Sequence, residues 1–286
     1  MMFAMIDDVK PQPNGGFAWV QAAAGAALVC EPLARLAPHL FTTRSWRLGS
    51  PGAPPADGWR DVAEAIGVEA AHLVRLHQVH GGAAFVADHR PHLLPTADIV
   101  VSDRDNAIAV QAADCVPLLI ADTRRGVVAA AHAGWRGQAA QVPHAAVAAM
   151  AREFDSRPED LIAAAGPSIG ACCYEVGSEV RDAFIRADGN DGRVDRWFVS
   201  EPQPTAVNPS LLGVAAPARP GHWFMDTWAI VRAQLEDAGV PADRIHVAEL
   251  CTASHPAWFC SYRRDGAPAG RLAAVIRRGK SSTTRE

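Results

Sequence analysis

The stretch Val116-Pro-Leu-Leu-Ile-Ala121, followed after a short polar turn by Val127-Val-Ala-Ala-Ala131, decides the fold class of this 286-residue chain. Both runs are continuously apolar and short, which is typical of strands that are buried on both faces. Similar runs at 108–110, 161–165 and 272–276 predict further strands. The strand-forming pattern therefore extends well beyond the opening stretch.

Helical patterns lie between these strands. The alanine-rich residues 145–154 follow Pro143, which a first helical turn tolerates, so a helix is predicted there. Residues 177–187 and 227–238 have helical spacing as well. Strands and helices together predict an α/β (α+β) fold, with mixed β-sheets flanked by helices in a single compact domain.

No shift in composition divides the chain into separate domains. We predict that residues 1–40 form an N-terminal segment of the same domain as residues 41–276, and that the polar residues 277–286 form a flexible tail. Residues 202–220 hold too many prolines for a regular element, and the Pro- and Gly-rich residues 50–58 predict a surface loop.

The charge balance indicates what kind of partner the protein has. There are 27 basic and 31 acidic residues, a net charge of −4, so the chain lacks the basic footprint of nucleic-acid-binding proteins. The apolar residues 17–30 are shorter than the ~20 that span a bilayer, and Asp7 and Asp8 precede them. We therefore expect no membrane span, a cytoplasmic location, reduced cysteines and a small-molecule partner.

Metal-binding residue types stand at the ends of apolar runs in Leu76-His-Gln-Val-His-Gly81, Ala112-Ala-Asp-Cys-Val-Pro117 and Ala131-His-Ala-Gly-Trp-Arg-Gly137. One cysteine and two histidines suit Zn²⁺, and three protein ligands leave a fourth position open for catalysis. Their spacing matches neither a zinc finger nor an HExxH helix. On spacing alone, a buried thiol with hydrogen-bonded loop histidines explains the pattern better than a metal site does.

The chain resembles the bacterial laccase-domain family, also described as polyphenol oxidoreductases, purine nucleoside phosphorylases or peptidoglycan editing factors. The resemblance extends from about residue 42 to residue 276. It rests on the three segments above and on three later ones: Gly166-Pro-Ser-Ile-Gly-Ala-Cys-Cys-Tyr-Glu-Val176, Cys251-Thr with Phe259-Cys-Ser-Tyr-Arg-Arg-Asp265, and Gly270-Arg271.

This resemblance implies that His80, Cys115 and His132 bind zinc, with copper as the alternative metal. It selects His80 over His77, which becomes a neighbouring or surface residue. It also implies a catalytic role for Arg44 in Phe41-Thr-Thr-Arg44, and a guanidinium there suits phosphate or a developing anion. The family follows this arginine with a Gly-Gly turn, whereas residues 45–60 differ here and predict a different N-terminal part of the pocket.

The implied activity is zinc-dependent purine nucleoside phosphorolysis of adenosine, inosine, guanosine or methylthioadenosine, with adenosine deamination as a second activity. Arg44, Cys115 and His132 are the predicted catalytic residues, and a nucleoside and phosphate are the predicted partners. An alternative is a hydrolase that edits peptidoglycan precursors with the same Cys and His residues. Copper-dependent polyphenol oxidation is disfavoured, because no two of the 11 histidines form a His-x-His pair.

Other residues are candidates for substrate contacts. We assign substrate binding to Arg44, Arg136 and Arg264, since arginine binds phosphate and ribose oxygens well. Arg263 is a further candidate of the same kind. Trp135 and Tyr262 are suited to stacking on a purine, although core packing explains them equally well.

Several alternatives stay open from the residues alone. Ser168 in Gly166-Pro-Ser-Ile-Gly170 matches the G-x-S-x-G pattern of a hydrolase nucleophile, for which a tight turn is the simpler explanation. Cys115 and His132 would also serve as a nucleophile and its base, with Asp98 or Asp114 orienting the ring.

Two further assignments complete the site. The same two carboxyl groups, Asp98 and Asp114, are candidates for a general acid. The remaining cysteines of the motif regions, which are Cys172, Cys173, Cys251 and Cys260, are interpreted as packing thiols.

Overall fold

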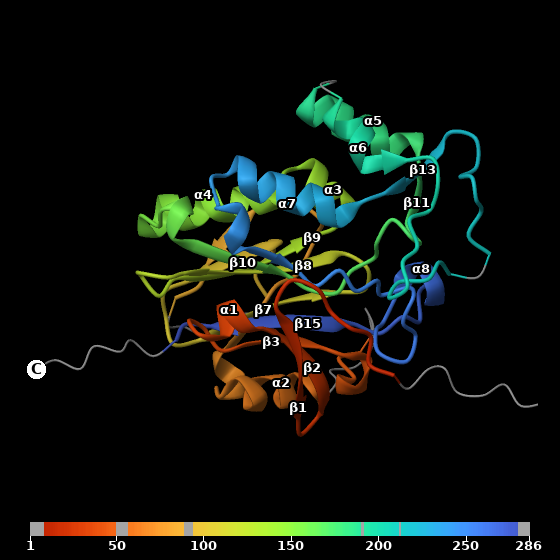
Figure 1. Cartoon of the computed structure of the whole chain (residues 1–286). Coiled ribbons are helices and arrows are strands. Elements are labelled where there is room, and N and C mark those ends of the chain that lie inside the picture. The colour runs from red at the N-terminus through yellow and green to blue at the C-terminus, as the bar shows by residue number, and fades with distance from the viewer. Residues whose placement is uncertain (1–8, 50–56, 89–93, 190–191, 212, 280–286) are drawn as a thin grey trace, which may run out of the picture.

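The computed structural model describes residues 9–49, 57–88, 94–189, 192–211 and 213–279. Two six-stranded sheets lie face to face, and a small three-stranded sheet stands at one end (Figure 1). In spatial order, the first sheet contains β1 (Phe17–Ala22), β2 (Gly25–Cys30), β3 (His39–Thr42), β15 (Leu272–Arg277), β7 (Ala107–Ala112) and β4 (Leu73–Arg75). The second contains β14 (Ile245–Val247), β10 (Leu161–Ala165), β8 (Val116–Asp122), β9 (Val128–Ala133), β6 (Ile99–Ser102) and β5 (Ala84–Val86). The third contains β11 (Glu175–Gly177), β13 (His222–Met225) and β12 (Phe198–Val199).

Helices cover the outer faces of both large sheets. Helices α4 (Val142–Phe154) and α7 (Thr227–Asp237) pack on the second sheet, and α2 (Gly58–Ile66) packs on the first. The layers therefore follow the order helix, sheet, sheet, helix (Figure 1). The remaining α-helices of the described residues are α1 (Glu31–Ala34), α3 (Trp135–Ala139), α5 (Ser178–Asp188), α6 (Arg193–Trp197) and α8 (Tyr262–Asp265).

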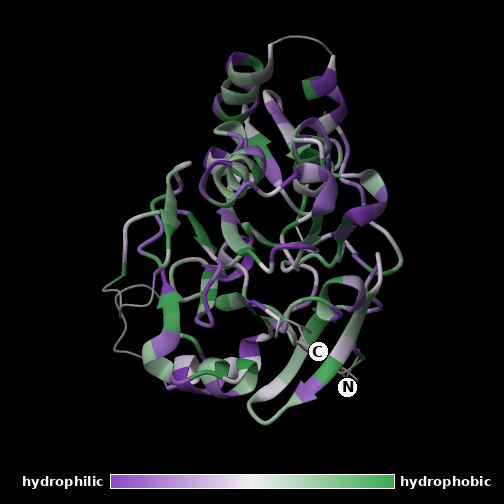
Figure 2. Ribbon diagram, turned by 90° about the vertical axis from the view of Figure 1, so that its left-hand side faces the viewer, coloured by the Kyte–Doolittle hydropathy of each residue, from purple (hydrophilic) through white to green (hydrophobic). Residues whose placement is uncertain are grey.

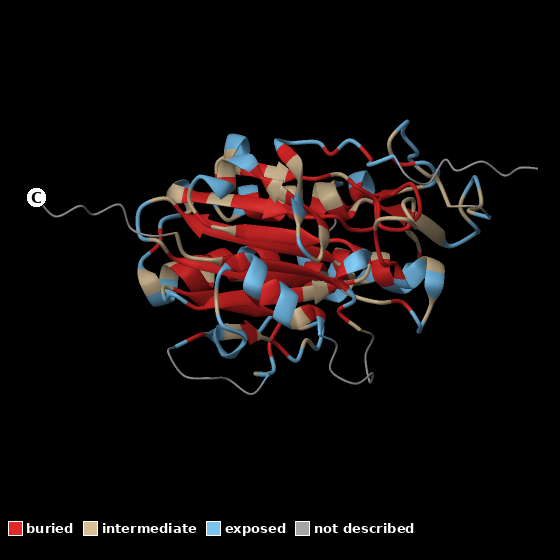
Figure 3. Cartoon of the chain, turned by 90° about the horizontal axis from the view of Figure 1, so that it is seen from below, coloured by how far each residue is buried: buried red, intermediate tan, exposed pale blue. Residues whose placement is uncertain are grey.

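The continuous apolar runs are explained by burial on both faces of a strand. Along β8, Leu118 and Ile120 pack against the helices, whereas Leu119 and Ala121 pack against the other sheet. Successive side chains of a strand point to opposite faces, so both sets must be apolar here. Figure 3 shows buried strands enclosed by exposed helices and loops, and the outer helices in Figure 2 carry both hydrophilic and hydrophobic residues.

The mixed α/β architecture predicted from the sequence is confirmed. Runs 108–110, 116–121, 127–131, 161–165 and 272–276 lie in β7, β8, β9, β10 and β15, and the three predicted helices correspond to α4, α5 and α7. Both large sheets mix parallel and antiparallel pairs.

The apolar residues 17–30 form a hairpin of β1 and β2, and no helix among the described residues is long and apolar enough to cross a bilayer. Residues 50–56 of the predicted loop and 280–286 of the predicted tail lie outside the described residues, while Gly58 begins α2. Between β12 and β13, the described part of 202–220 contains no helix or strand, as predicted.

A buried neutral histidine ties β2 to β3. His39 is 3% exposed; its Nε2 accepts a hydrogen bond from the backbone N–H of Cys30 at 2.9 Å, and its Nδ1 donates to the carbonyl of Ala37 at 2.9 Å. Burial penalises the charged ring and lowers the pKa of His39 to about 4. The native protein therefore holds this ring neutral.

This buried ring predicts loss of stability in acid. A lowered pKa means that the stabilisation is complete above the unfolded value near 6.5 and disappears as pH falls towards 4, at up to about 1.4 kcal/mol per pH unit. Urea unfolding of metal-free protein between pH 7 and pH 4 should give a shallower pH dependence for His39→Gln than for wild type. The exposed His144 provides the control, because His144→Gln should keep the wild-type slope. Equal slopes for His39→Gln and wild type would contradict this prediction.

Candidate metal centre

The structure brings His80, Cys115 and His132 together from three separate segments. His80 lies in the loop after β4, Cys115 in the turn between β7 and β8, and His132 near the end of β9. Their ligand atoms all lie within 4.8 Å of one another. Because His132 is buried, Cys115 half-buried and His80 exposed, the trio is closed on one side and open on the other.

The carboxylate of Asp98 organises two of these ligands. One oxygen accepts hydrogen bonds from the backbone N–H of His80 at 3.0 Å and from Nδ1 of His132 at 2.8 Å. The other accepts from the N–H groups of Val79 at 3.1 Å and Gly81 at 2.7 Å. Since Nδ1 of His132 is held by Asp98, its Nε2 is the nitrogen left to bind a metal.

The electrostatics of Asp98 agree with this role. Burial would raise the pKa of its carboxyl, but the hydrogen bonds from His132 and the backbone outweigh burial and lower that pKa. Asp98 is therefore an anion at neutral pH although it is 0% exposed. A buried anion that holds the far nitrogen of a ligating histidine is a common support for metal sites.

The loop that carries His80 is fixed from a second side by Gln78. Its side-chain amide donates to the carbonyl of Gln111 at 2.8 Å and accepts from the N–H of Gln111 at 2.8 Å. This side chain thus imitates a strand pairing with β7. His80 itself has a φ of 61°, a left-handed conformation that non-glycine residues adopt mainly where surrounding contacts impose it.

The close approach of Cys115 and His80 requires glycine at position 134. A Cβ atom there would lie 2.8 Å from Sγ of Cys115 and 3.1 Å from Cδ2 of His80. Any side chain at Gly134 would push the thiol and the ring apart. The Gly in His132-Ala-Gly-Trp-Arg136 is therefore part of the centre.

The residues present fit a metal ion. Burial would raise the pKa of Cys115, but the charges and hydrogen bonds of His132 and His80 outweigh burial and lower it to about 6. Burial would lower the pKa of His132, but Cys115 and Asp98 raise it to about 9. A thiolate is thus available at neutral pH, and one thiolate with two imidazoles suits Zn²⁺ or copper, with a position left open.

Asp114 connects the cysteine turn to the C-terminal motif. Its buried carboxylate accepts hydrogen bonds from Oγ1 of Thr252 at 2.6 Å and from the N–H of Arg263 at 2.6 Å. Burial raises the pKa of this carboxyl. Both candidate general acids, Asp98 and Asp114, therefore have their carboxylates engaged inside the protein.

The centre opens into a hollow of about 830 Å³, here called the metal hollow. Its volume is typical of small-molecule sites. Its lining includes the three ligands; the aromatic residues Trp59, Trp135, Tyr174 and Tyr262; and the arginines Arg75, Arg136, Arg263 and Arg271. Asp114 is the one carboxylate among the described residues that line it.

The four arginines of the metal hollow outnumber its one carboxylate, that of Asp114. Within the described part of the chain, no carboxylate forms an ion pair with any of the four. Arg136 stacks on Trp135 with its Cζ 4.2 Å from the ring centroid, and Arg263 stacks on Tyr174 at 4.9 Å. Stacking fixes each guanidinium in place; that of Arg263 also donates from Nη1 to the carbonyl of Glu175 at 2.7 Å, which leaves its other N–H groups for a ligand.

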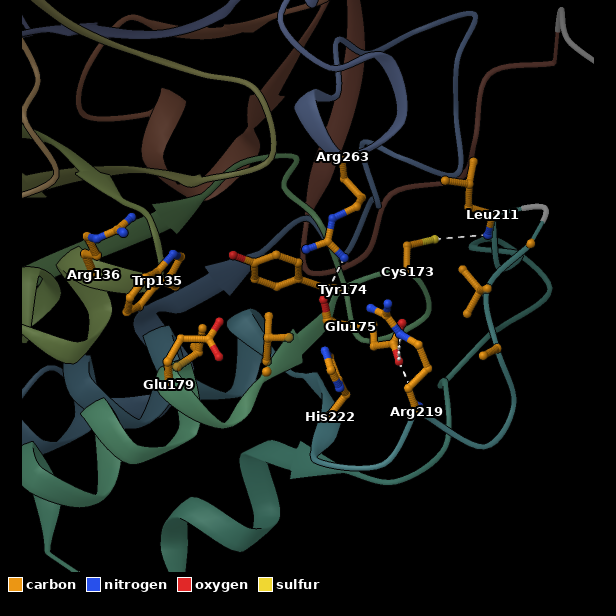
Figure 4. A pocket seen from close by; sticks show the side chains of 16 residues that line it. Trp135, Arg136, Cys173, Tyr174, Glu175, Glu179, Leu211, Arg219, His222 and Arg263 are labelled. Atoms are coloured by element: carbon orange, nitrogen blue, oxygen red, sulfur yellow. Dashed lines mark hydrogen bonds and ion pairs between the residues drawn. The ribbon is translucent and has the colours of Figure 1, made fainter.

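A second hollow of about 730 Å³ adjoins the first. The two share Trp135, Arg136, Tyr174 and Arg263, and Figure 4 shows these four side chains at the second hollow. The second hollow is also lined by the ion pair of Arg219 and Glu175, and by Glu179 and His222. The metal centre thus has an adjacent space large enough for a second chemical group.

Two arginines named in the sequence analysis do not line the metal hollow. Arg44 is exposed, lies in the short 3-10 helix Arg44–Trp46, and donates to the carbonyl of Pro256. Arg264 donates to the carbonyls of Thr252 and Phe259, so its guanidinium supports the C-terminal segment. Their functional assignments stay predictions.

Other candidates have clear structural positions. His77 lines the metal hollow, with Nδ1 3.4 Å from Oγ1 of Thr96, outside the cluster of three ligands. Ser168 is 0% exposed, and its Oγ accepts from Nε1 of Trp228 at 2.8 Å, so it is not presented to substrate as a hydrolase nucleophile is.

Sequence reasoning missed Trp59, Arg75, Gln78, Gln111 and Arg271 as parts of this site. Gln78 and Arg271 lie in segments that carried the family resemblance, so their motifs held a usable signal. Trp59 and Arg75 belong to no recognised motif, so the sequence held no signal for them. They are brought together by the fold, with Cζ of Arg75 4.8 Å from the Trp59 ring centroid.

Fold and site together define the class: a mixed α/β protein with an open His–Cys–His centre beside a cationic hollow. Residues 56–279 match the sequence model of the family described as multi-copper polyphenol oxidoreductase laccase. The chain belongs to this family.

Similar proteins carry enzymatic names. A protein from Streptomyces coelicolor named purine nucleoside phosphorylase is 39% identical over 232 residues, covering 79% of this chain and 83% of the relative. A protein named adenosine deaminase, from an unknown prokaryotic organism, is 32% identical over 227 residues, covering 76% and 79%. The solved structure of YlmD from Geobacillus stearothermophilus matches with a TM-score of 0.75 at 28% identity, covering 93% of this chain and 99% of that one.

The support from Asp98 predicts a large effect of a small substitution. In Asp98→Asn, an amide NH₂ would face backbone N–H groups that now meet a carboxylate oxygen, and Nδ1–H of His132 would lose its anion. We expect affinity for Zn²⁺, measured by competition with a chromophoric chelator, to fall about 10- to 100-fold. Asp122 is buried and accepts from the N–H groups of Arg124 and Arg125 away from the centre, so Asp122→Asn is the matched control. An equal loss of Zn²⁺ affinity in both variants would refute a specific role for Asp98.

Proposed function

We propose that this chain is a zinc-dependent purine nucleoside phosphorylase that acts on adenosine, inosine, guanosine and methylthioadenosine, and that it also deaminates adenosine. The observation that carries the proposal is the opening of the His80–Cys115–His132 centre into a hollow with both aromatic rings and arginines that form no ion pair among the described residues. A nucleoside offers a flat base, and phosphate offers an anion. The names of the similar proteins support both activities.

The purine base would stack on the aromatic side of the metal hollow. Trp135 and Tyr262 are the candidates named from the sequence, and both line the hollow. Tyr262 is 57% exposed, which is unusual for a large aromatic side chain and suits a surface that a ligand covers.

Inorganic phosphate would bind to Arg136 and Arg263. Both guanidinium groups are positioned by aromatic rings and lack ion-pair partners among the described residues. Each presents several N–H donors in a plane, which matches the oxygens of phosphate. Held beside the metal centre, phosphate would lie close to the ribose carbon that it attacks.

Zinc would be held by His80, Cys115 and His132, with copper as the alternative for this donor set. When bound, it supplies Lewis acidity to the reacting oxygen or water. Asp98 keeps the proton of His132 on Nδ1, so this ring presents one fixed nitrogen throughout. The proposed location is the cytoplasm, where free thiols such as the six cysteines persist.

Removal of the thiolate should remove metal and activity together. We expect Cys115→Ala to retain its far-ultraviolet circular dichroism, to lose bound Zn²⁺, and to lose phosphorolysis and deamination by about 100-fold or more. Metal content by mass spectrometry and a nucleoside panel measure these effects. Cys30→Ala changes a buried free cysteine far from the centre in sequence and should keep both activities. Normal adenosine turnover by Cys115→Ala would disprove the mechanism.

The arginine assignment separates the two activities. Arg263→Gln removes one charged contact to phosphate, worth roughly 1.5–3 kcal/mol, so KM for phosphate in phosphorolysis should rise about 10- to 100-fold. Deamination needs no phosphate and should change little. Arg136→Gln should behave in the same way, and the surface variant Arg124→Gln is the control for lost charge. An unchanged KM for phosphate in both variants would contradict the assignment.

The same assay tests the assignments made from the sequence. Arg44→Gln would raise KM for phosphate only if Arg44 reaches the site during turnover. Arg264→Gln should lower thermal stability rather than phosphate affinity, because its guanidinium binds backbone carbonyls.

The second hollow favours one alternative function, a hydrolase that edits peptidoglycan precursors. A nucleoside with phosphate suits the volume of the metal hollow alone, whereas a precursor that joins sugar, phosphate and peptide groups would use both spaces. Incubation with a precursor carrying a wrong amino acid, followed by mass spectrometry, distinguishes this hydrolase from the phosphorylase.

A further inference from the structure

A group of three cysteine thiols lies at the wall of the second hollow, and one of them, Cys173, lines that hollow. Cys172, Cys173 and Cys251 are 1%, 1% and 0% exposed, and their Sγ atoms all lie within 4.8 Å of one another. These three residues are called the thiol cluster. Sequence alone indicated packing thiols, because neighbouring cysteines in a chain do not reveal a third one brought from elsewhere.

Backbone pairing places the third thiol. Ser168 and Cys251 form an isolated parallel bridge, in which the N–H of Ser168 donates to the carbonyl of Leu250 at 3.1 Å and that of Thr252 donates to the carbonyl of Ser168 at 3.1 Å. This pairing fixes Cys251 beside the turn that leads into Cys172 and Cys173. The cluster is therefore held by the backbone and does not depend on a flexible loop.

Polar groups around the thiol cluster suit sulfur atoms that bear negative charge. The backbone N–H of Leu211 donates to Sγ of Cys173 at 3.2 Å, as Figure 4 shows, and that of Gly170 donates to Sγ of Cys251 at 3.5 Å. Oγ of Ser254 lies 3.6 Å and 3.5 Å from the sulfurs of Cys172 and Cys173. Unlike the two N–H donors, this hydroxyl turns lone pairs towards the sulfurs because it donates its proton to the carbonyl of Pro209 at 2.6 Å, an arrangement that suits S–H groups or a bound cation rather than bare thiolates.

We propose that the thiol cluster binds one soft monovalent cation of the Cu⁺ type, at a site separate from His80, Cys115 and His132. Three sulfur donors without imidazole or carboxylate favour a thiophilic ion. Structural Zn²⁺ sites take four ligands drawn from Cys, His and carboxylate side chains, and the described residues supply only three such ligands here, with the neutral hydroxyl of Ser254 beside two of them. Cu⁺ accepts three donors, so no fourth ligand is needed.

The step is a ligand exchange without oxidation or reduction. Each sulfur that binds the ion loses its proton to solvent, and a metal–sulfur bond replaces the S–H bond. The buried thiolates would be costly without a cation, and the N–H donors of Gly170 and Leu211 stabilise the charge that remains. Access is provided by Cys173, which forms part of the wall of the second hollow.

The experiment measures Cu⁺ stoichiometry without oxygen, by competition with a chromophoric Cu⁺ chelator. Cys115→Ala removes the first centre and should leave one equivalent of Cu⁺ per chain, with the ultraviolet charge-transfer absorption of Cu⁺–thiolate bonds. The double variant Cys115→Ala/Cys251→Ala should lose that equivalent and its absorption. Cys115→Ala/Cys30→Ala carries the same number of substitutions and should keep it, since Cys30 is a buried free cysteine outside both groups.

A second measurement needs no substitution. Cu⁺ should slow alkylation of Cys172, Cys173 and Cys251 in the wild-type protein at least 10-fold, as mapped by peptide mass spectrometry, while leaving Cys260 unchanged. The proposal fails if Cys115→Ala binds no Cu⁺, if the Cys251→Ala double variant retains it, or if the thiols form a disulfide that excludes the ion. None of these outcomes depends on nucleoside turnover, so the site is tested separately from the proposed function.

Discussion

The buried carboxylate of Asp98 is the contact on which the rest of the site depends. Asp98 directly precedes β6 in the second sheet, His80 follows β4 of the first sheet, and His132 belongs to β9. One carboxylate therefore joins the loop of one sheet to a strand of the other, through four hydrogen bonds. Its own backbone takes part, because the carbonyl of Asp98 accepts from the N–H of His132 at 2.8 Å. The metal centre is thus also a point where the two sheets are joined.

The metal centre requires two residues to adopt an unfavourable backbone conformation. His80 and Asp114 both have positive φ, at 61° and 88°, although neither is glycine. Such conformations persist where surrounding contacts determine them, and they cluster at functional sites. Hydrogen bonds of Asp98 and Gln78 fix the loop that carries His80. Hydrogen bonds from Thr252 and from the N–H of Arg263 fix the carboxylate of Asp114. Segments far apart in the chain are therefore needed to keep Cys115 facing the two histidines.

The sequence pattern predicted strands and helices well, but it could not decide which of two nearby residues reaches the site. Strands that are buried on both faces, such as β8, can be recognised in the sequence by uninterrupted apolar runs. The hairpin of β1 and β2 lies at the edge of its sheet and is only partly buried, so its sequence pattern did not predict strands. His80 was separated from His77 by family resemblance alone, since the partner that decides between them, Asp98, is distant in the chain. Arg263 and Arg264 are adjacent on α8, where successive residues point about 100° apart, so Arg263 lines the hollow and Arg264 does not, although both guanidinium groups donate to backbone carbonyls.

The charge of the side chains around the metal hollow distinguishes between candidate functions better than the metal ligands do. An open His–Cys–His site serves a hydrolase, a deaminase or a phosphorylase equally, because each uses a Lewis acid. The four arginines around the hollow exceed the negative charge that Asp114 and Cys115 offer there, and an excess of like charge destabilises a folded protein. Binding of an anion offsets that cost, whereas a neutral nucleoside with water does not. The arginines thus favour a reaction in which phosphate, or a substrate that carries it, occupies the space beside the metal.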